Sequence, residues 1–359
     1  MRYLPTPGRS LDGRKVLRFE NGTEIRTQNL STALLLTLCI CLLAAVSVHL
    51  GQTRISIQEL LEALSGSVLD EEQDYALWTI RIPRLLMAFM VGWSIAIAGA
   101  VMQSLARNPL ADPGLFGLNQ GATTMILLLI VLVPAASKLM IMSSALIGGL
   151  LVATLLIWLV GGGARTHGLA ILLMGIALET VLSSITSLLI LYTPQEVSYA
   201  LADWLAGSLF NATAENVLTF LPFFVFSFAG ILLIGPCLSR YELGNDAAMA
   251  LGLSIRLTRP LILGFAVLLS TAAVTSVGPL TFLGILAPHI AAFLTPLKGR
   301  ARLFISGLVG GLLVISADVL TRSLESDIPV PIGLSLTLIG VPLFILALRL
   351  QAINRQTQH

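Results

Sequence analysis

Long apolar runs separated by short polar stretches make up most of this 359-residue chain. A helix needs about 20 apolar residues to cross a bilayer core about 30 Å thick. Measured against that length, the pattern predicts ten spans: Leu30–Leu50, Leu85–Leu105, Leu115–Val133, Leu139–Val160, Leu169–Tyr192, Val217–Leu238, Pro260–Val277, Leu280–Leu297, Leu303–Leu320 and Ile328–Leu350. We therefore expect an all-α polytopic membrane protein with about ten transmembrane helices in residues 30–350.

The composition agrees with a membrane protein and excludes an ordinary soluble domain. Hydrophobic residues make up 56% of the chain and charged residues 11%, whereas charged residues make up about a quarter of soluble domains. The mean hydropathy is +0.90. Gly and Pro number 31 and 16, which membrane helices tolerate where neighbouring groups satisfy the freed backbone. Bent, closely packed helices are expected.

The placement of Lys and Arg predicts the orientation. Cytoplasmic loops carry the excess of these residues. With the ten predicted spans, 16 of the 21 lie on the side of the membrane that holds the N-terminus. The other side keeps Arg54, Arg81, Arg84, Lys138 and Arg322. This bias predicts a multi-pass protein of the cytoplasmic (inner) membrane with both termini inside. Residues 1–29 are then a flexible cytoplasmic tail, and residues 351–359 a second short tail.

Two amphipathic segments are predicted to lie along the outer surface without crossing the membrane. Ser56 and Glu59 have the spacing of a capping box, in which Ser accepts an early helix N–H and Glu reaches back. They open the stretch ELLEALSG. The second segment, Tyr199–Phe210, places Trp204 where an interfacial aromatic is expected.

The stretch RNPLADPGLFGLNQGA, residues 107–122, interrupts the apolar pattern between the second and third spans. Asn108-Pro109 and Asp112-Pro113 end helices, because the residue before proline is driven out of the helical region. Asn119 and Gln120 then open a span, where polar groups are tolerated only against protein or a water-filled cavity. The alternative is a polar turn followed by small-residue helix packing.

A second interruption, GPLTFLGILAPHI at 278–290, lies between the seventh and eighth spans. Spans two to five and seven to ten form two sets that start in opposite directions. Broken segments at matching places in inverted halves mark the transport pathway of secondary transporters. The residues predicted to form a translocation path are Asn108, Pro109, Asn119, Gln120, Gly121, Gly278 and Pro279.

Catalytic and metal-binding patterns are missing from the sequence. No lysine among Lys15, Lys138 and Lys298 belongs to a Gly-Lys-Ser/Thr loop for ATP, and neither HExxH nor GxSxG occurs. The three cysteines have no metal-site spacing. We predict no catalytic residue, no metal site, no cofactor and no nucleic-acid partner. Any ATP hydrolysis must come from a partner chain.

Several motifs together resemble one family of permeases. They are RIPRLL at 81–86, GAVMQSLARNPLADPGLFGLNQGA at 99–122, DWLAGSL at 203–209, GPLTFLGILAPHI at 278–290, AD at 317–318 and PIGLSLTLIGVPLF at 331–344. These residues resemble the FecCD-type permeases, membrane subunits of ABC importers for ferric siderophores, haem and cobalamin. The resemblance implies a second permease, identical or paralogous, beside this one. It also implies a substrate-binding protein outside and two ATP-binding subunits in the cytoplasm.

The resemblance gives a role to three of the outer arginines. Snorkelling is the ordinary explanation for an arginine at a membrane boundary. At the motif positions of Arg81, Arg84 and Arg322, the resemblance implies pairing with acidic residues of the docked binding protein, a contact that suits the guanidinium fork. Arg54 and Lys138 have no such match.

The longest inside loop, residues 239–259, is predicted to contain a short helix from Asn245 to Leu251, stopped by Gly252. It is either a plain connector or, as the resemblance implies, the segment that couples the permease to the ATPase. The candidate coupling residues are Glu242, Gly244, Asp246, Ala247, Leu251 and Gly252.

The predicted function is a permease subunit that passes a ferric siderophore into the cytoplasm. The first alternative is the same machinery with haem or cobalamin as its cargo. A different class, an ion-coupled secondary carrier, should have buried ion-binding carboxylates. Glu179 is the one acid near the middle of a predicted span, and an intramembrane acid is a functional candidate by default.

Overall fold

A computed structural model describes residues 6–10, 13, 15–19, 24–51, 53–66, 69–160, 168–193, 204–210, 212–295, 298–323 and 330–356. In this part of the chain, ten helices are apolar, and seven of them are long enough to cross a membrane. The predicted all-α architecture with about ten membrane helices is therefore confirmed.

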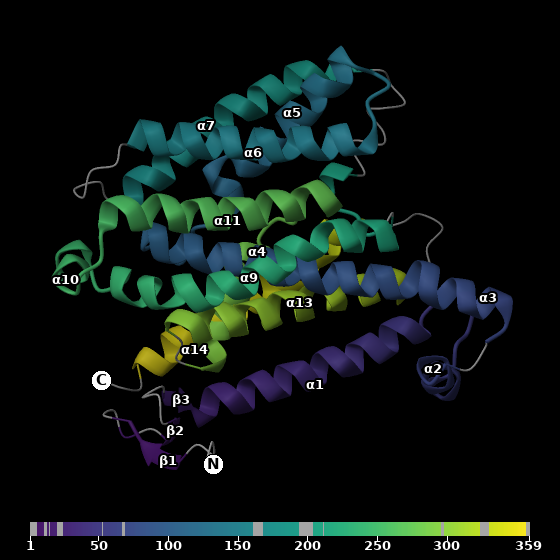
Figure 1. Ribbon diagram of the computed structural model, residues 1–359, viewed down its shortest axis with the longest axis horizontal. Helices are drawn as coiled ribbons and strands as arrows, with labels where there is room; N and C mark the ends of the chain where they lie inside the picture. The colour runs from purple at the N-terminus through teal and green to yellow at the C-terminus, as the bar shows by residue number, and fades with distance from the viewer. Residues whose placement is uncertain are drawn as a thin grey trace.

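The long helices run side by side along the longest axis of the molecule (Figure 1). They are α1 (Thr27–His49), α4 (Ile82–Ala106), α6 (Lys138–Val160), α7 (Gly168–Ile190), α9 (Ala214–Tyr241), α11 (Ile255–Val277) and α13 (Gly299–Ser323). The others are α5 (Leu118–Leu132), α12 (Leu283–Leu294) and α14 (Ile332–Gln356), whose apolar part ends at Leu346. The short α5 and α12 are the two spans whose starts are polar or broken in sequence.

Helix α4 continues outward without a break. It is preceded by α3 (Glu71–Asp74) and by a π-helix, η1 (Tyr75–Arg81), so that Glu71–Ala106 forms one helix of 36 residues. At 1.5 Å per residue its length is about 54 Å, well beyond the bilayer core of about 30 Å. Its first turns therefore project past the membrane, where Figure 1 shows α2 and α3 together at one end of the molecule.

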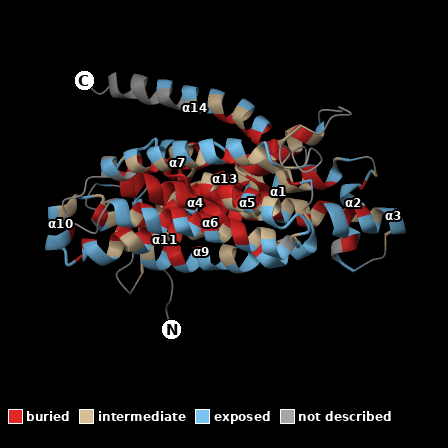
Figure 2. Cartoon of the chain, turned by 90° about the horizontal axis from the view of Figure 1, so that it is seen from above, coloured by how far each residue is buried: buried red, intermediate tan, exposed pale blue. Residues whose placement is uncertain are grey.

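The core is centred on α4 and α13, most of whose residues are buried, and Figure 2 shows buried residues concentrated in the middle of the bundle. The two helices approach closely because Gly92 and Gly310 face each other, and a Cβ on either would overlap the carbonyl oxygen of the other. Such small-residue contacts stabilise helix pairs in membranes, where no hydrophobic effect acts between helices. Trp93 links α4 to α9, because its Nε1 donates a hydrogen bond to Ser227 Oγ at 2.8 Å.

The two sets of four helices repeat a pattern of lengths. The first set, α4 to α7, has 25, 15, 23 and 23 residues. The second set, α11 to α14, has 23, 12, 25 and 25. In each, a long helix is followed by a short one that starts after an interruption.

The outer segment α2 (Ile57–Leu64) has the predicted capping box. Ser56 N donates to Glu59 Oε2 at 2.7 Å, and Glu59 N donates to Ser56 Oγ at 3.2 Å. Leu60 packs against a small cluster that includes Val48 and Leu77, so α2 is fixed to the outer ends of α1 and η1.

The segment around Trp204 differs from the prediction of an interfacial strip. Tyr199 lies outside the described residues, but Trp204 is half-buried and packs against a cluster with Ala122 and Val274. Ser208 N donates to Val277 O at 2.8 Å, and Ile332 N donates to Gly207 O at 3.1 Å. Backbone pairing with the end of α11 and the start of α14 therefore holds this segment against the bundle.

The prediction of a flexible N-terminal tail is wrong for part of that segment. Three short antiparallel strands, β1 (Thr6–Arg9), β2 (Lys15–Arg18) and β3 (Glu24–Arg26), form a sheet in the order β1-β2-β3. Thr27 begins α1 directly after β3, before the predicted boundary at residue 30. Ladder hydrogen bonds and the burial of Val16 compensate for the polar sequence.

Candidate functional site

The first interruption forms a tight turn between α4 and α5. Arg107 ends α4 with a positive φ of 49°, and Asn108 Oδ1 accepts a hydrogen bond from the backbone N–H two residues later at 2.9 Å. Asp112 Oδ2 likewise accepts the N–H of Gly114 at 2.9 Å and caps a 3-10 turn, η2 (Pro113–Phe116). The helix-ending role predicted for Asn108-Pro109 is confirmed, because α4 ends just before it, whereas Asp112-Pro113 opens the 3-10 turn.

This turn re-enters the helix bundle instead of resting on its surface. A Cβ on Gly175 of α7 would lie 2.8 Å from Cα of Phe116, and a Cβ on Gly117 would lie 3.1 Å from the backbone N of Glu179. Both contacts are near the middle of the 23-residue α7. Irregular backbone is tolerated at membrane depth when protein surrounds it, so α5 starts inside the bundle and has only 15 residues.

The two interruptions meet at Asp112 and Gly284. Asp112 is buried, and its Oδ1 lies so close to Gly284 at the start of α12 that a Cβ there would overlap it. The backbone N–H of Gly284 faces this carboxylate. Gly284 also packs onto Gly99 of α4, where a Cβ would overlap the Gly284 carbonyl. The start of α12 is therefore fixed between α4 and the re-entrant turn.

The remaining predicted path residues have different surroundings. Asn119 and Gln120 are half-buried at the start of α5, and a Cβ on Gly121 would lie 2.8 Å from the carbonyl oxygen of Gly148, which makes Gly121 a helix-packing residue. Gly278, with a φ of 80°, faces the carbonyl of Trp204. Gly278 and Pro279 thus belong to the junction with the Trp204 segment, while Asn119 belongs to the re-entrant turn.

Three hydroxyl residues on one side of α7, which we call its polar face, were missed in the sequence. Thr180, Ser184 and Ser187 recur at intervals of four and three residues and are exposed, with the apolar side chains of Leu173 and Ile176 exposed on the same side of the helix. Their hydroxyls donate to carbonyl oxygens of the preceding turn at 2.9–3.0 Å. Beside them Glu179 is half-buried, and its carboxyl group has no hydrogen-bond partner in the part of the chain described. The 3.6-residue spacing was the available signal.

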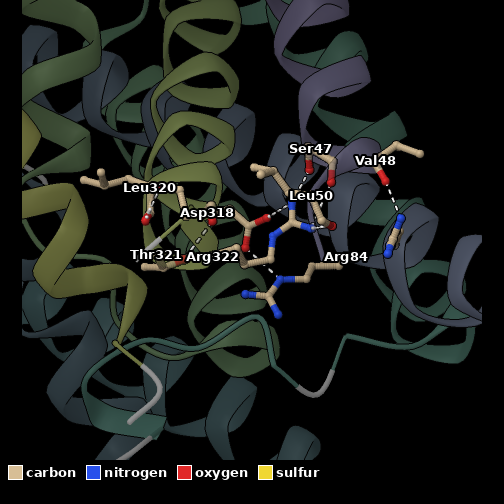
Figure 3. Close-up of polar contacts among 10 residues, drawn as sticks. Ser47, Val48, Leu50, Arg84, Asp318, Leu320, Thr321 and Arg322 are labelled. Atoms are coloured by element: carbon tan, nitrogen blue, oxygen red, sulfur yellow. Dashed lines mark hydrogen bonds and ion pairs between the residues drawn. The ribbon is translucent and has the colours of Figure 1, made fainter. Parts of the chain in front are cut away.

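Two of the predicted docking arginines pair with one aspartate. Arg84 Nε donates to Asp318 Oδ1 at 2.7 Å, and Arg322 Nη2 lies 2.8 Å from Oδ2 of the same carboxylate (Figure 3). Only 1% of the Asp318 side chain is exposed, against 16% for each arginine. Arg322 also donates to the carbonyl of Ser47 at 2.9 Å. The group joins α1, α4 and α13 at the end of the bundle that carries α2 and α3, which is predicted to face outside.

The three arginines therefore differ in how much of each guanidinium group remains available to a partner protein. Arg81 is buried and donates to the carbonyls of Val48, at 2.6 Å, and Thr53. Arg322 is also largely engaged. Arg84 uses only Nε internally, and Figure 3 shows its Nη groups directed away from Asp318. Of the three, Arg84 keeps a free edge of its guanidinium in the described structure.

The inside loop contains the predicted short helix. Helix α10 (Asn245–Ala250) lies between Gly244 and Gly252, whose φ angles of 109° and 79° favour glycine. Asp246, Ala247, Leu251 and Gly252 are exposed, whereas Glu242 and Gly244 are half-buried. Arg107 Nη2 donates to Asn245 Oδ1 at 2.6 Å and so fixes the start of α10 to the end of α4. Figure 1 shows α10 at the opposite end of the molecule from α2 and α3.

A family model described as the FecCD transport family matches residues 35–350. The chain belongs to this family. FecCD transport family relatives include the Fe(3+) dicitrate transport system permease protein FecD of Escherichia coli (strain K12), which is 32% identical over 88% of this chain and 97% of its own length.

Two further relatives describe the range of the FecCD family. The cobalamin import system permease protein BtuC of Halobacterium salinarum is 32% identical over 76% of this chain and 72% of its own length. A solved structure described as an inward-facing conformation of a metal-chelate type ABC transporter superposes with a TM-score of 0.78. It is 26% identical and covers 89% of this chain and 99% of its own.

Membership confirms the resemblance of the motifs and excludes an enzyme. The protein is a multi-pass membrane permease of an ABC importer for iron chelates or cobalamin, and it is a transport subunit. FecD and BtuC are both 32% identical to this chain over the parts that match, so the family alone does not choose between those cargoes.

Proposed function

We propose that this chain passes a ferric siderophore across the cytoplasmic membrane as one of two adjacent permeases. The observation that carries the proposal is the polar face of α7, formed by Thr180, Ser184 and Ser187 beside Glu179. Lipid supplies no hydrogen bonds, so polar groups on a membrane helix normally face a bundle interior or a water-filled path. Exposed hydroxyls on a single permease suit a path shared with a second one.

The chemistry of this face favours a large polar chelate as cargo. Hydroxyl groups offer hydrogen bonds without fixed charge, and so bind a hydrated chelate weakly enough to release it. The ferric dicitrate relative supports an iron chelate. The second candidate is cobalamin, which the 32% identical cobalamin permease supports over 76% of this chain. An ion-coupled carrier would need a set of carboxylates, and the groups described in the structure provide no such cluster.

The outer end is proposed to receive a substrate-binding protein. Arg84 keeps its Nη edge free while Asp318 holds Nε, so the guanidinium is already oriented for a carboxylate of the partner. Arg81 and Arg322 support this arrangement from within by fixing the ends of α1 and α13.

The inner end is proposed to engage an ATP-binding subunit through α10. Leu243, Met249 and Leu251 are 58%, 45% and 55% exposed around this helix. Apolar side chains at a tip outside the bundle suit a hydrophobic cleft on a soluble partner. Both termini are then cytoplasmic. Six spans precede α10 and four follow it, so each terminus lies on the same side of the membrane as α10.

Reconstitution tests the proposal directly. The permease, its second permease, the ATP-binding subunits and the binding protein are placed in proteoliposomes and offered labelled ferric siderophores, haem and cobalamin with ATP. We expect ATP-dependent uptake of a ferric siderophore and none with an ATPase unable to hydrolyse ATP. Uptake of cobalamin alone would select the second candidate. Uptake driven by an ion gradient without nucleotide would refute the importer.

A further inference from the structure

A polar cluster beneath the inside loop joins the candidate coupling residue Glu242 to side chains that have no role in the site described above. Glu242, which ends α9, accepts at Oε1 from Arg302 Nη1 at 2.7 Å and from Ser104 Oγ at 2.6 Å. Arg302 Nη2 donates to Gln103 Oε1 at 3.0 Å. The cluster therefore joins the inner ends of α4, α9 and α13.

The cluster extends toward the translocation path. Gln103 is buried, and its Nε2 donates at 3.4 Å to the carbonyl oxygens of Gly284 and Ile285 at the start of α12. Gly284 is the residue that packs against Asp112 in the re-entrant turn. A continuous series of contacts thus runs from the loop that holds α10 to the point where the two interruptions meet.

The branch point of the series is Arg302. One arm of its guanidinium holds Glu242 on the loop side, and the other holds Gln103 on the path side. A planar fork can hold two partners in fixed directions, whereas a lysine ammonium on the same stem acts as a point charge. The ion pair is largely shielded, with 20% and 24% of the two side chains exposed, so solvent screens it less than a surface pair.

We propose that Arg302 is a positioning residue that transmits movement of the ATPase-engaged loop to the start of α12. This inference rests on the proposed function of α10. When the partner subunit displaces the loop, Glu242 displaces Arg302, and the Gln103 arm shifts the α12 start against Asp112. If the contact between Arg302 and Gln103 is lost, ATP hydrolysis continues but no longer drives transport, and the fold stays intact.

The experiment compares transport with ATP hydrolysis in the complete complex in proteoliposomes. Arg302→Lys keeps the charge beside Glu242 but loses one arm, and Gln103→Ala removes the path-side partner. We expect each to retain binding-protein-stimulated ATPase activity within about twofold while chelate uptake per ATP falls roughly tenfold. The double variant should lose no more than either single variant, because contacting residues in one series are not additive.

The matched control is Arg300→Lys. Arg300 lies two residues earlier on α13 and donates from Nε and Nη2 to the single carbonyl of Leu232 at 3.0 and 2.9 Å. Its replacement should leave uptake per ATP unchanged. Melting temperatures of all variants identify any loss of folding, and Gln103→Glu, which keeps an acceptor for Arg302 but no donor for α12, serves if Gln103→Ala is unstable.

The outcomes separate the two claims. Normal uptake per ATP in stable Arg302→Lys and Gln103 variants would overturn the role of Arg302, as would independent, multiplying losses in the double variant. If the wild-type complex itself takes up no chelate with ATP, the proposed function fails instead.

Discussion

At the scale of single residues, the outer end depends on one carboxylate that serves two cations. Asp318 is almost fully buried, and it forms ion pairs with Arg84 from α4 and with Arg322 from its own helix. Removing one partner of a buried pair leaves uncompensated charge in a medium of low dielectric constant. Asp318 therefore determines whether two arginines can remain inside the bundle.

We predict that Asp318→Asn destabilises the protein by roughly 3 kcal/mol. Thermal unfolding of the purified permease in detergent measures the change, with Glu62→Gln as the control because Glu62 is exposed on α2. Equal melting temperatures for wild type and Asp318→Asn would mean that the two arginines are stable without their shared partner.

The docking role of Arg84 has a separate signature. Arg84→Lys preserves a positive charge beside Asp318 but loses the free Nη edge. We predict roughly three- to tenfold weaker binding of the substrate-binding protein at low salt, with a smaller difference at high salt because exposed charges are screened. Arg54→Gln, an exposed outer arginine without a motif match, is the control. Unchanged affinity in Arg84→Lys would exclude Arg84 from the docking surface.

At the scale of helices, the residues where α5 and α12 begin determine how deep the two interruptions lie in the bundle. Hydropathy predicted spans from residues 115 and 280, but the helices begin at 118 and 283, after Gly117 and Phe282 with positive φ. The sequence could predict that the chain turns at these places, because proline and glycine act locally. It could not predict their depth, which depends on contacts with α7 and α4.

We predict that Gly284→Ala abolishes most transport and destabilises the protein by about 1–3 kcal/mol, because the added methyl group overlaps Asp112 and separates α12 from α4. Gly264→Ala in α11 is the control, since a Cβ there meets no atom within 4 Å. Uptake in proteoliposomes and thermal unfolding measure both effects. Transport at the wild-type rate in Gly284→Ala would show that this contact is dispensable.

The outer helix α2 should respond to pH through its cap. The backbone N–H of Ser56 holds the pKa of Glu59 below its ordinary value of 4.5. The contribution of Glu59 is therefore complete above pH 4.5 and is lost as pH falls through the lowered pKa. We predict, after correction for intrinsic rates, faster hydrogen exchange in α2 at about pH 3 than at about pH 7. Glu59→Gln, which has no titrating carboxyl group to accept the backbone N–H of Ser56, should lack this difference.

At the scale of the whole molecule, the sequence predicted the number and order of the membrane helices well, because hydropathy and length suffice for that. It missed the sheet at residues 6–26, since TPGR and EIR have little strand character and only pairing stabilises them. It also missed Arg302. Read as one more cytoplasmic arginine, this residue had no visible partner until α4 and α9 were placed beside it.

The orientation of the bundle can be tested with two cysteines. In a chain without Cys39, Cys41 and Cys237, we predict that Asp246→Cys on α10 reacts with an impermeant thiol reagent only from the cytoplasmic side. Glu71→Cys on α3 should react only from outside. Labelling of intact cells and inverted vesicles measures both, and the reverse pattern would invert the proposed topology.

In the unbroken helix from Glu71 to Ala106, Arg84 and Gln103 are 19 residues or about 28 Å apart. Between them, Gly92 and Gly99 pack against the backbones of Gly310 and Gly284. A rigid helix of this length can connect its two ends without contact with the cargo path. Docking of the binding protein outside and movement of the ATP-binding subunit inside would both tilt this helix, so each event would affect the other even when the path is empty.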